Sequence, residues 1–180
     1  MTSDVTTVGP WTAAATASLM CQFEPTDWLF DRVDAGERSV DALIAVTVEV
    51  RLRAGGMAPC ALVGARFVSS DRADTELAVG HSAELAEGVR PSCVGLLGRS
   101  LVSGLPKEFA EGVLNGLVRV EAPLPPGRLE VVAAGYDDVD SSEFAFERAA
   151  GLLRHVLSDL ASNKEFGAPA IAEVLREWHT

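Results

Sequence analysis

The sequence predicts an α+β fold, a two-layer sandwich in which two helices cover one face of a mostly antiparallel sheet. Residues 46–53 alternate apolar and polar side chains, with Val at most of the apolar positions, which is typical of a half-buried strand. Two later segments carry apolar residues at helical spacing instead. The predicted elements follow the order strands, helix, strand, helix, which favours helices packed on one sheet face.

The first 39 residues show no sustained pattern, and we expect a partly disordered N-terminal segment. Thr, Ser, Ala, Pro and Asp dominate it, and chain termini are usually mobile. The apolar cluster of residues 28–30 is expected to dock on the domain. We therefore divide the chain into a segment at 1–39, a domain at 40–162 and a C-terminal helix at 163–180.

The domain is predicted to begin with a β-hairpin. Residues 46–53 form a strand with one buried and one wet face, Gly55 and Gly56 break it, and 60–68 resume an extended apolar run. Further strands are predicted at residues 93–102 and 129–134, with a short one at 77–79.

Helix signals begin at Pro106, which suits a first helical turn. A core-facing stripe follows at four-residue spacing: Phe109, Val113 and Leu117. The second helix covers residues 140–160; Asp140 is expected to cap it, and Glu143 supplies the returning carboxylate of a capping box. The last helix, after Gly167, carries apolar residues at positions i, i+3, i+4 and i+7: Ile171, Val174, Leu175 and Trp178.

Composition excludes two broad classes. The 180 residues are 48% hydrophobic, unlike disordered polyanions, and their formal net charge of −11 is unlike proteins that hold nucleic acid by bulk charge. No stretch reaches the ~18 consecutive apolar residues of a membrane-spanning helix. Asp4 stands where a signal peptide carries positive charge. We expect a cytoplasmic protein with no membrane partner.

The three cysteines, Cys21, Cys60 and Cys93, predict no disulfide framework. They are odd in number, widely spaced and contain no C-x-x-C pair. We expect three reduced and mostly buried thiols. A nucleophilic pair of Cys93 with His81 is a lower-ranked alternative.

No constellation predicts catalysis, a cofactor or a metal. Asp138, Asp140 and Ser142 alternate as calcium-loop ligands do, but a helix is predicted where the turn Gly should be, which favours capping. Ser141 and Ser142 lack a G-x-S-x-G elbow, and phosphate-binding Gly-rich motifs are absent. The three histidines lie far apart in the sequence: His81, His155 and His179. We expect a non-enzymatic protein.

The helix start Val139-Asp140-Ser141-Ser142-Glu143, preceded by Tyr136-Asp137-Asp138 and followed by Phe144-Ala145-Phe146, resembles a signature of the fourth domain of translation elongation factor G. Upstream, residues 103–109 (Ser-Gly-Leu-Pro-Lys-Glu-Phe) are similar to that family's strand end and Pro-started helix. The resemblance covers residues 93–160.

The resemblance implies a fold shared with a ribosomal protein domain, including a left-handed βαβ crossover against the general right-handed preference. In the full-length factors this domain is the arm that reaches the ribosomal decoding centre through two tip loops. Here these would be residues 54–58 and 134–138. The implied contact residues are Gly55, Gly56, Met57, Tyr136, Asp137 and Asp138.

Both loops depart from the family pattern. Met57 stands where the family has a basic residue after Gly-Gly, and Asp137 stands where it usually has His after the Tyr. RNA contact uses cations and donors against phosphate, so Asp137 and Asp138 are expected to repel it. No GTPase domain is recognisable in the sequence.

Two hypotheses of function follow. The first is a non-enzymatic, translation-factor-like domain whose partner is the ribosome. The alternative is a protein–protein interaction module on the same fold that has lost RNA contact and binds through residues 1–39 and the helix at 171–178. A small-molecule enzyme on this fold ranks last, and the sequence leaves the oligomeric state open.

Overall fold

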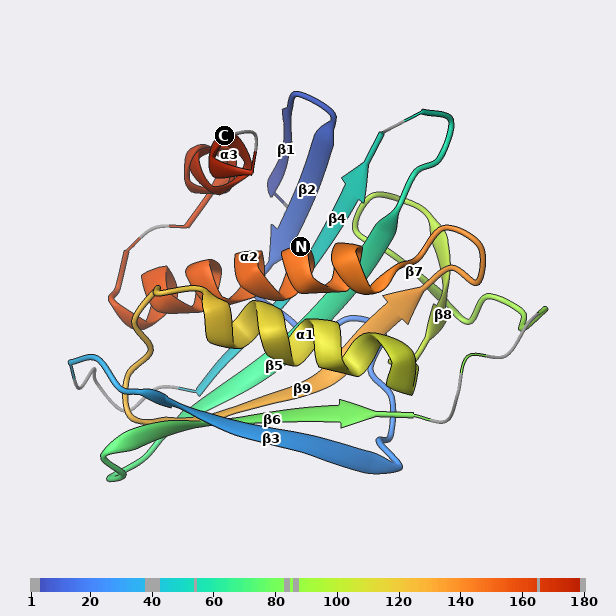
Figure 1. Ribbon diagram of the computed structural model, residues 1–180. Helices are drawn as coiled ribbons and strands as arrows, with labels where there is room; N and C mark the ends of the chain where they lie inside the picture. Colours follow the sequence, from blue (N-terminus) through green and yellow to red (C-terminus); the bar gives the residue numbers. More distant parts are fainter. Residues whose placement is uncertain are drawn as a thin grey trace.

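The computed structural model describes residues 4–37, 43–53, 55–82, 85, 88–164 and 166–178. These residues form a mixed α+β unit with an open sheet of nine strands and with three helices (Figure 1). The strands are β1 (Asp4–Val8), β2 (Trp11–Thr16), β3 (Asp27–Asp34), β4 (Leu43–Leu52), β5 (Cys60–Ser69), β6 (Asp74–His81), β7 (Cys93–Val94), β8 (Ser100–Ser103) and β9 (Gly127–Tyr136). The helices are α1 (Lys107–Arg119), α2 (Glu143–Ala161) and α3 (Ala168–Glu177).

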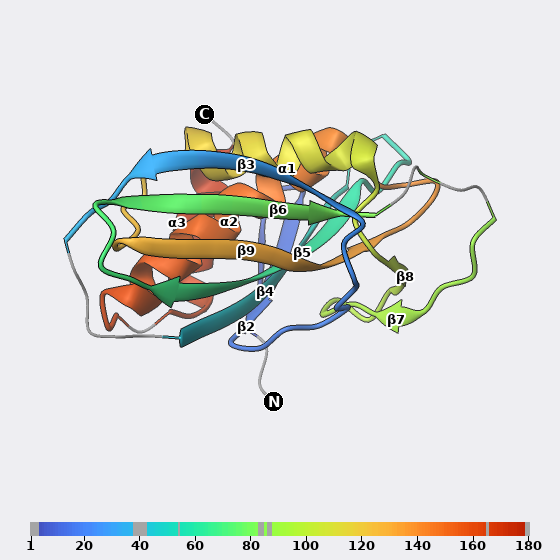
Figure 2. The same cartoon turned by 90° about the horizontal axis from the view of Figure 1, so that it is seen from below.

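The strand order in the sheet is β1-β2-β4-β5-β9-β6-β3, and β8 pairs with β9 and with β7 (Figure 2). Within the described ranges every strand pair is antiparallel except β6 with β9, which are parallel and are connected through β7, β8 and α1. The predicted hairpin is confirmed, because β4 and β5 pair from Leu43 opposite Val68 to Arg51 opposite Cys60.

One face of the sheet, which we call the helix face, carries the main hydrophobic core. Alternate residues of β4, such as Val46 and Val48, are fully buried there in one cluster with the apolar stripes of α1 and α2. Phe109 and Phe146 stack across the two helices with ring centroids 5.0 Å apart. A Cβ on Gly116 would lie 2.9 Å from the Cβ of Ala150, so the helices approach closely at this point.

Three strands come from the segment that the sequence predicts to be partly disordered. β1, β2 and β3 pair within the sheet, and Ala13, Ala14 and Ala15 of β2 have no exposed surface. Alanine is a weak strand former, so a run of three gives no strand signal. Here the small side chains fit because both faces of β2 are covered.

The C-terminal helix packs on its own chain rather than standing free for a partner. Ile171 and Leu175 of α3 are fully buried in the main core, and the Trp178 ring lies 4.8 Å from Trp11 of β2 between centroids. The apolar face of this helix is therefore occupied by its own chain. No described helix is long and apolar enough to cross a bilayer.

Asp140 does not cap α2, so this part of the predicted capping box is wrong. Ser142 occupies the N-cap with an extended backbone, and its side chain accepts a hydrogen bond from the Ala145 amide at 3.2 Å. The Asp140 carboxylate is instead bound by Arg99, at 2.5 Å from Nη2. A capping motif considers only neighbouring residues, so it cannot predict an ion pair with a distant segment.

The opposite face of β4 is not wet as predicted. Thr47 and Glu49 are fully buried there, because two irregular segments cross this part of the sheet. We call residues 17–26 and 92–101 together the cover. The predicted strand at 93–102 is interrupted within the cover, since Gly95 donates its amide to the Arg99 carbonyl and Gly98 adopts a positive φ of 76°.

A disulfide between Cys21 and Cys93 joins the two segments of the cover, so the prediction of three reduced thiols is wrong. Cys60 is the free cysteine and is buried. The two bonded residues are 72 positions apart, and no spacing pattern links them. Their proximity depends on how β7 folds back over the sheet, which is a tertiary feature.

Candidate contact site at the loop end of the sheet

Two loops lie at one end of the sheet, but the second begins later than the resemblance implies, because residues 134–136 of the implied loop belong to β9. The β4–β5 loop covers residues 53–59, and the β9–α2 loop covers residues 137–142 (Figure 1). They are joined where the Cys60 amide donates to the Asp140 carbonyl at 3.3 Å and the Ser141 hydroxyl donates to the Cys60 carbonyl at 2.8 Å. We call the described residues of these two loops the loop end.

Two apolar side chains are exposed on the outer rim of the loop end. Met57 is 68% exposed and Val139 is 84% exposed. Gly55 and Gly56 have positive φ angles of 57° and 85°, and a Cβ on either would meet nothing within 4 Å. The rim therefore combines two exposed apolar side chains with open backbone.

Asp137 turns inward from this rim. Its Oδ1 accepts hydrogen bonds from the amides of Val139 and Asp140, each at 3.0 Å, and its Oδ2 lies 2.9 Å from Arg99 Nη2. Burial alone would raise the pKa of Asp137, but the two amides and the Arg99 guanidinium outweigh it and lower the pKa. Asp137 is thus an ionised structural group that shares the Arg99 cation with Asp140.

The other implied contact residues divide between surface and interior. Tyr136 is 6% exposed, and burial raises its pKa, with Asp138 and Glu108 adding to the rise. Asp138 is exposed and accepts a hydrogen bond from the Gly88 amide at 3.2 Å. Of the six, Gly55, Gly56, Met57 and Asp138 therefore face solvent, whereas Tyr136 packs inside.

One exposed arginine lies in the first loop, and another follows, in the sequence, the segment that contacts the second loop. Arg53 begins the first loop, and Arg90 follows Gly88, whose amide contacts Asp138. Both side chains are exposed. Arg99 compensates one of the two negative charges of Asp137 and Asp140, and the exposed arginines add to the charge of the surface together with Asp138.

The nucleophile candidates lack the partners that activation needs. Ser141 donates to a backbone carbonyl and accepts from the Asp137 amide, with no base within hydrogen-bond reach among the described residues. Cys60 lies 3.9 Å from the Ser141 hydroxyl, and burial raises the pKa of its thiol, which keeps the thiol protonated. Cys93 is bonded to Cys21, so a Cys93–His81 pair has no free thiol.

The predicted histidines form no common site. His81 is buried on β6, and His155 is half-buried on α2, where burial lowers its pKa. His179 lies outside the described residues. Within the part of the chain that the structure covers, no group of three or more His, Cys, Asp or Glu side chains could hold a metal ion.

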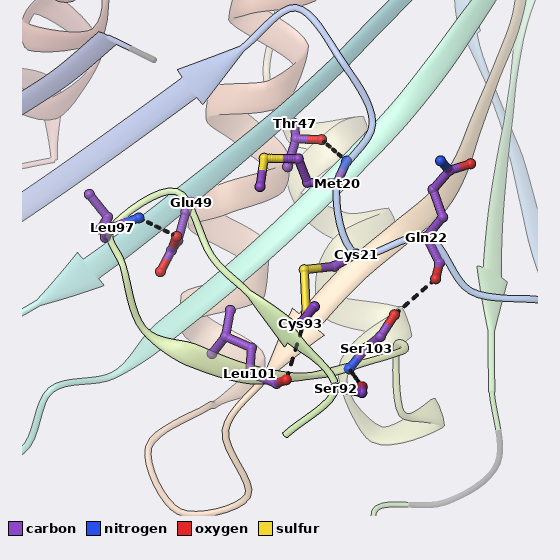
Figure 3. The surroundings of a disulfide bond; sticks show 10 residues. All are labelled: Met20, Cys21, Gln22, Thr47, Glu49, Ser92, Cys93, Leu97, Leu101 and Ser103. Carbon is purple, nitrogen blue, oxygen red and sulfur yellow. Dashed lines mark hydrogen bonds between the residues drawn. A yellow bond between two sulfur atoms is a disulfide. The ribbon is translucent and has the colours of Figure 1, made fainter. Parts of the chain in front are cut away.

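Sequence reasoning missed Glu49, a fully buried carboxyl beneath the cover. Its Oε2 accepts a hydrogen bond from the Leu97 amide at 2.8 Å, and its Oε1 has no hydrogen-bond partner (Figure 3). Burial raises its pKa, opposed by the Leu97 amide and by Arg51. The alternation of β4 was the available signal, and it placed Glu49 on a wet face.

Comparisons with known proteins identify no family. No family model matches the chain, and no curated protein matches it. Among solved structures, it is similar to a crystal structure of ttk003000868 from Thermus thermophilus, with a TM-score of 0.43 and 18% identity. That alignment covers 77% of this chain and 18% of the other. A likeness at this level assigns neither a fold family nor a function.

Proposed function

We propose that the chain is a non-enzymatic, translation-factor-like domain, similar to domain IV of elongation factor G, that contacts the ribosome through the loop end. The observation that carries the proposal is the position of two loops at the same end of the sheet, where Ser141 of the β9–α2 loop donates to the carbonyl of Cys60, the residue that follows the β4–β5 loop. The motif at residues 139–143 also lies between β9 and α2, as it would in that family.

The finer fold belongs to the same proposal. A two-layer sandwich with a left-handed βαβ crossover requires a parallel strand pair joined through a helix. The parallel pair β6 and β9 is joined through a connection that contains α1, which supports this topology.

Local charge supports the ribosomal partner more than the net charge of −11 suggests. Arg99 pairs with both Asp137 and Asp140, so these carboxylates do not face a phosphate backbone as free charges. Arg53 is exposed in the first loop. Contact with RNA depends on such local cations.

Co-sedimentation with ribosomes at low salt tests the proposal. Met57→Lys restores the basic residue that the family has after Gly-Gly, and we expect it to strengthen association severalfold and to steepen its salt dependence. Leu43→Lys is the matched control, because Leu43 is 75% exposed at the opposite end of β4. Absence of association for both the wild type and Met57→Lys would contradict a ribosomal role.

A second candidate is a protein-interaction module, favoured by the exposure of Met57 and Val139 at the loop end. Apolar contacts of this kind suit the centre of a protein interface. For such a partner Met57→Lys weakens binding, whereas for ribosomal RNA it strengthens binding. The sign of this one substitution therefore separates the two candidates.

A further inference from the structure

We propose that the Cys21–Cys93 disulfide is a reducible latch, opened by a dithiol, that holds residues 92–99 of the cover over Glu49 and Cys60. Figure 3 shows the bond between the two segments of the cover, with the Leu97 amide against Glu49. A disulfide that only adds stability would not require the strained backbone at Cys21 or the incompletely hydrogen-bonded Glu49 beneath the segment that it holds.

Besides the disulfide, polar contacts hold residues 92–99, namely the Leu97–Glu49 hydrogen bond and the ion pairs of Arg99 with Asp137 and Asp140. β7 pairs with β8 through two residue pairs, Cys93 with Leu101 and Val94 with Ser100. Among residues 92–100 the buried position is Gly95, which has no side chain to pack. A segment with so few buried apolar contacts belongs to the part of a fold that opens at low cost.

The segment is anchored at its far end. Leu101 is buried in a small cluster with Cys60 and Leu62, and Val102 and Ser103 of β8 pair with β9. Release of Cys93 therefore frees the β7 side of the hairpin while β8 stays in the sheet. Opening is local, and residues 92–99 move.

The other side of the latch is held in an unfavourable backbone conformation. Cys21 has a positive φ of 53°, a left-handed conformation that is uncommon for a residue other than glycine. The Cys21 carbonyl accepts a hydrogen bond from the Ala134 amide at 3.1 Å. The disulfide and this bond together hold the conformation, and reduction removes the covalent part.

Glu49 favours opening once the latch is reduced. Its fully buried carboxyl has one hydrogen bond, to the Leu97 amide, and one oxygen without a partner. The charged groups that influence it are Arg51 on its own strand and Arg99 on the cover. Water would satisfy the second oxygen in the open form, whereas the closed form leaves it unpaired.

The Cys21–Cys93 bond is accessible to a reductant, and its reduction is chemically balanced. Cys21 and Cys93 are partly exposed, so a reductant reaches the bond. A dithiol gives two electrons and two protons to the S–S bond, which yields two cysteine thiols, and the dithiol itself becomes a disulfide.

The latch reaches the loop end through Arg99, and this consequence rests on the proposed function. Arg99 lies in the released segment and binds Asp137 and Asp140. When residues 92–99 open, these carboxylates lose their cation and the loop end becomes more acidic. The oxidised form is then the one that suits RNA.

Cys60 reports on the latch, because it is the free cysteine and lies beneath the cover with no exposed surface. The test treats the full chain with N-ethylmaleimide before and after dithiothreitol and follows each cysteine by mass spectrometry. We expect Cys60 to react at least tenfold faster in the reduced protein. The double variant Cys21→Ser/Cys93→Ser should match the reduced rate without reductant.

Glu49→Gln gives a second arm, since the amide retains an acceptor for Leu97 but carries no charge. We expect the reduced Glu49→Gln protein to label Cys60 several times more slowly than the reduced wild type at pH 8. Circular dichroism and hydrogen exchange of α1 and α2 accompany each measurement.

Two results would overturn the latch. Equal protection of Cys60 in the oxidised, reduced and double-variant proteins would show that the cover stays closed without the bond. Loss of exchange protection in α1 and α2 on reduction would show global unfolding rather than local release. Ribosome binding enters neither readout, so failure of the proposed function leaves the latch standing, and the reverse also holds.

Discussion

The two faces of the sheet are stabilised by different means. The helix face buries long aliphatic and aromatic side chains of β4, β5 and β9 against α1 and α2 in one large cluster. The covered part of the opposite face has a cluster of only three fully buried residues among those described, Cys60, Leu62 and Leu101, with the disulfide cysteines packed against it. There, hydrogen bonds, ion pairs and one covalent bond replace hydrophobic area.

This difference means that one face supplies most of the stability of the fold, whereas contacts on the other face can be changed by a single chemical event. Hydrophobic burial is spread over many side chains, so no single chemical event removes it. The cover depends on a few specific links, and reduction of Cys21–Cys93 or ionisation of Glu49 alters one of them at once. A change of redox state or pH is therefore expected to alter the covered face first, while the core of the helix face maintains the fold.

The largest effect is expected from Phe146→Ala on the helix face. Phe146 has no exposed surface and stacks on Phe109, so truncation should cost about 3–5 kcal/mol in the free energy of unfolding. Urea denaturation measures it. Phe144→Ala is the control, because Phe144 is 46% exposed and should lose well under half as much. Equal losses would break the contrast between core and surface.

Glu49→Gln tests whether the buried Glu49 carboxyl makes the stability of the covered face depend on pH. The folded-state pKa of Glu49 is raised above its ordinary value of 4.5, so the stability it contributes is full below that value and falls as pH rises through the folded pKa. Glu49→Gln should remove this pH dependence of stability. At pH values above the raised pKa, its free energy of unfolding should exceed that of the wild type by about 2 kcal/mol. Denaturation at a series of pH values that begins below 4.5 and rises until the wild-type stability levels off measures it.

The control for this titration is Glu111→Gln, on the exposed surface of α1. It should follow the wild-type pH profile. A wild-type stability that is flat with pH, or one that rises over the interval, would mean that Glu49 is not a strained buried acid.

Ser142→Ala tests the observed start of α2. Loss of the side-chain cap to the Ala145 amide should cost about 1 kcal/mol. Asp140→Asn, which the sequence pattern would rank as the capping change, should leave the helix start intact. A larger loss of helical signal in Asp140→Asn than in Ser142→Ala would restore the predicted cap.

The smallest effect on stability is expected from Arg99→Ala, because the two ion pairs are partly exposed and screened. The pKa of Asp137 is the sharper readout. It is lowered in the folded protein, so its stabilisation is present above the ordinary value of 3.8 and is lost as pH falls through the folded pKa. Arg99→Ala should raise the pKa of Asp137, measured by NMR titration, and an unchanged value would exclude the pairing.

Local patterns predicted the elements whose side chains alternate or repeat regularly. The β4–β5 hairpin, the three helices and the strand ending at Tyr136 all have such patterns, because one side of each packs against the core. β2 was missed because three alanines carry no β-branched or aromatic signal. The strand at 93–102 was predicted too long because the turn at Gly95 and Gly98 interrupts it.

The candidate site was predictable only in part, because residues 134–136 of the implied second loop belong to β9 and the ion pairs beside it have no local signal. The resemblance named the loops at residues 54–58 and 134–138, yet Arg99 is 38 positions from Asp137 and no spacing rule connects them. The same holds for Glu49 and Leu97, which are 48 positions apart. Such contacts depend on the path of the cover across the sheet, and that path follows from tertiary packing.

Native-state hydrogen exchange on the oxidised and reduced protein tests the contrast between the two faces most directly. The Leu97 amide, which donates to Glu49, reports on the cover, and amides in the middle of α2 report on the helix face. We predict that reduction speeds exchange at Leu97 at least tenfold more than it does in α2. Equal acceleration at both places, or none at Leu97, would contradict the claim that the disulfide stabilises the cover while the core of the helix face is stable without it.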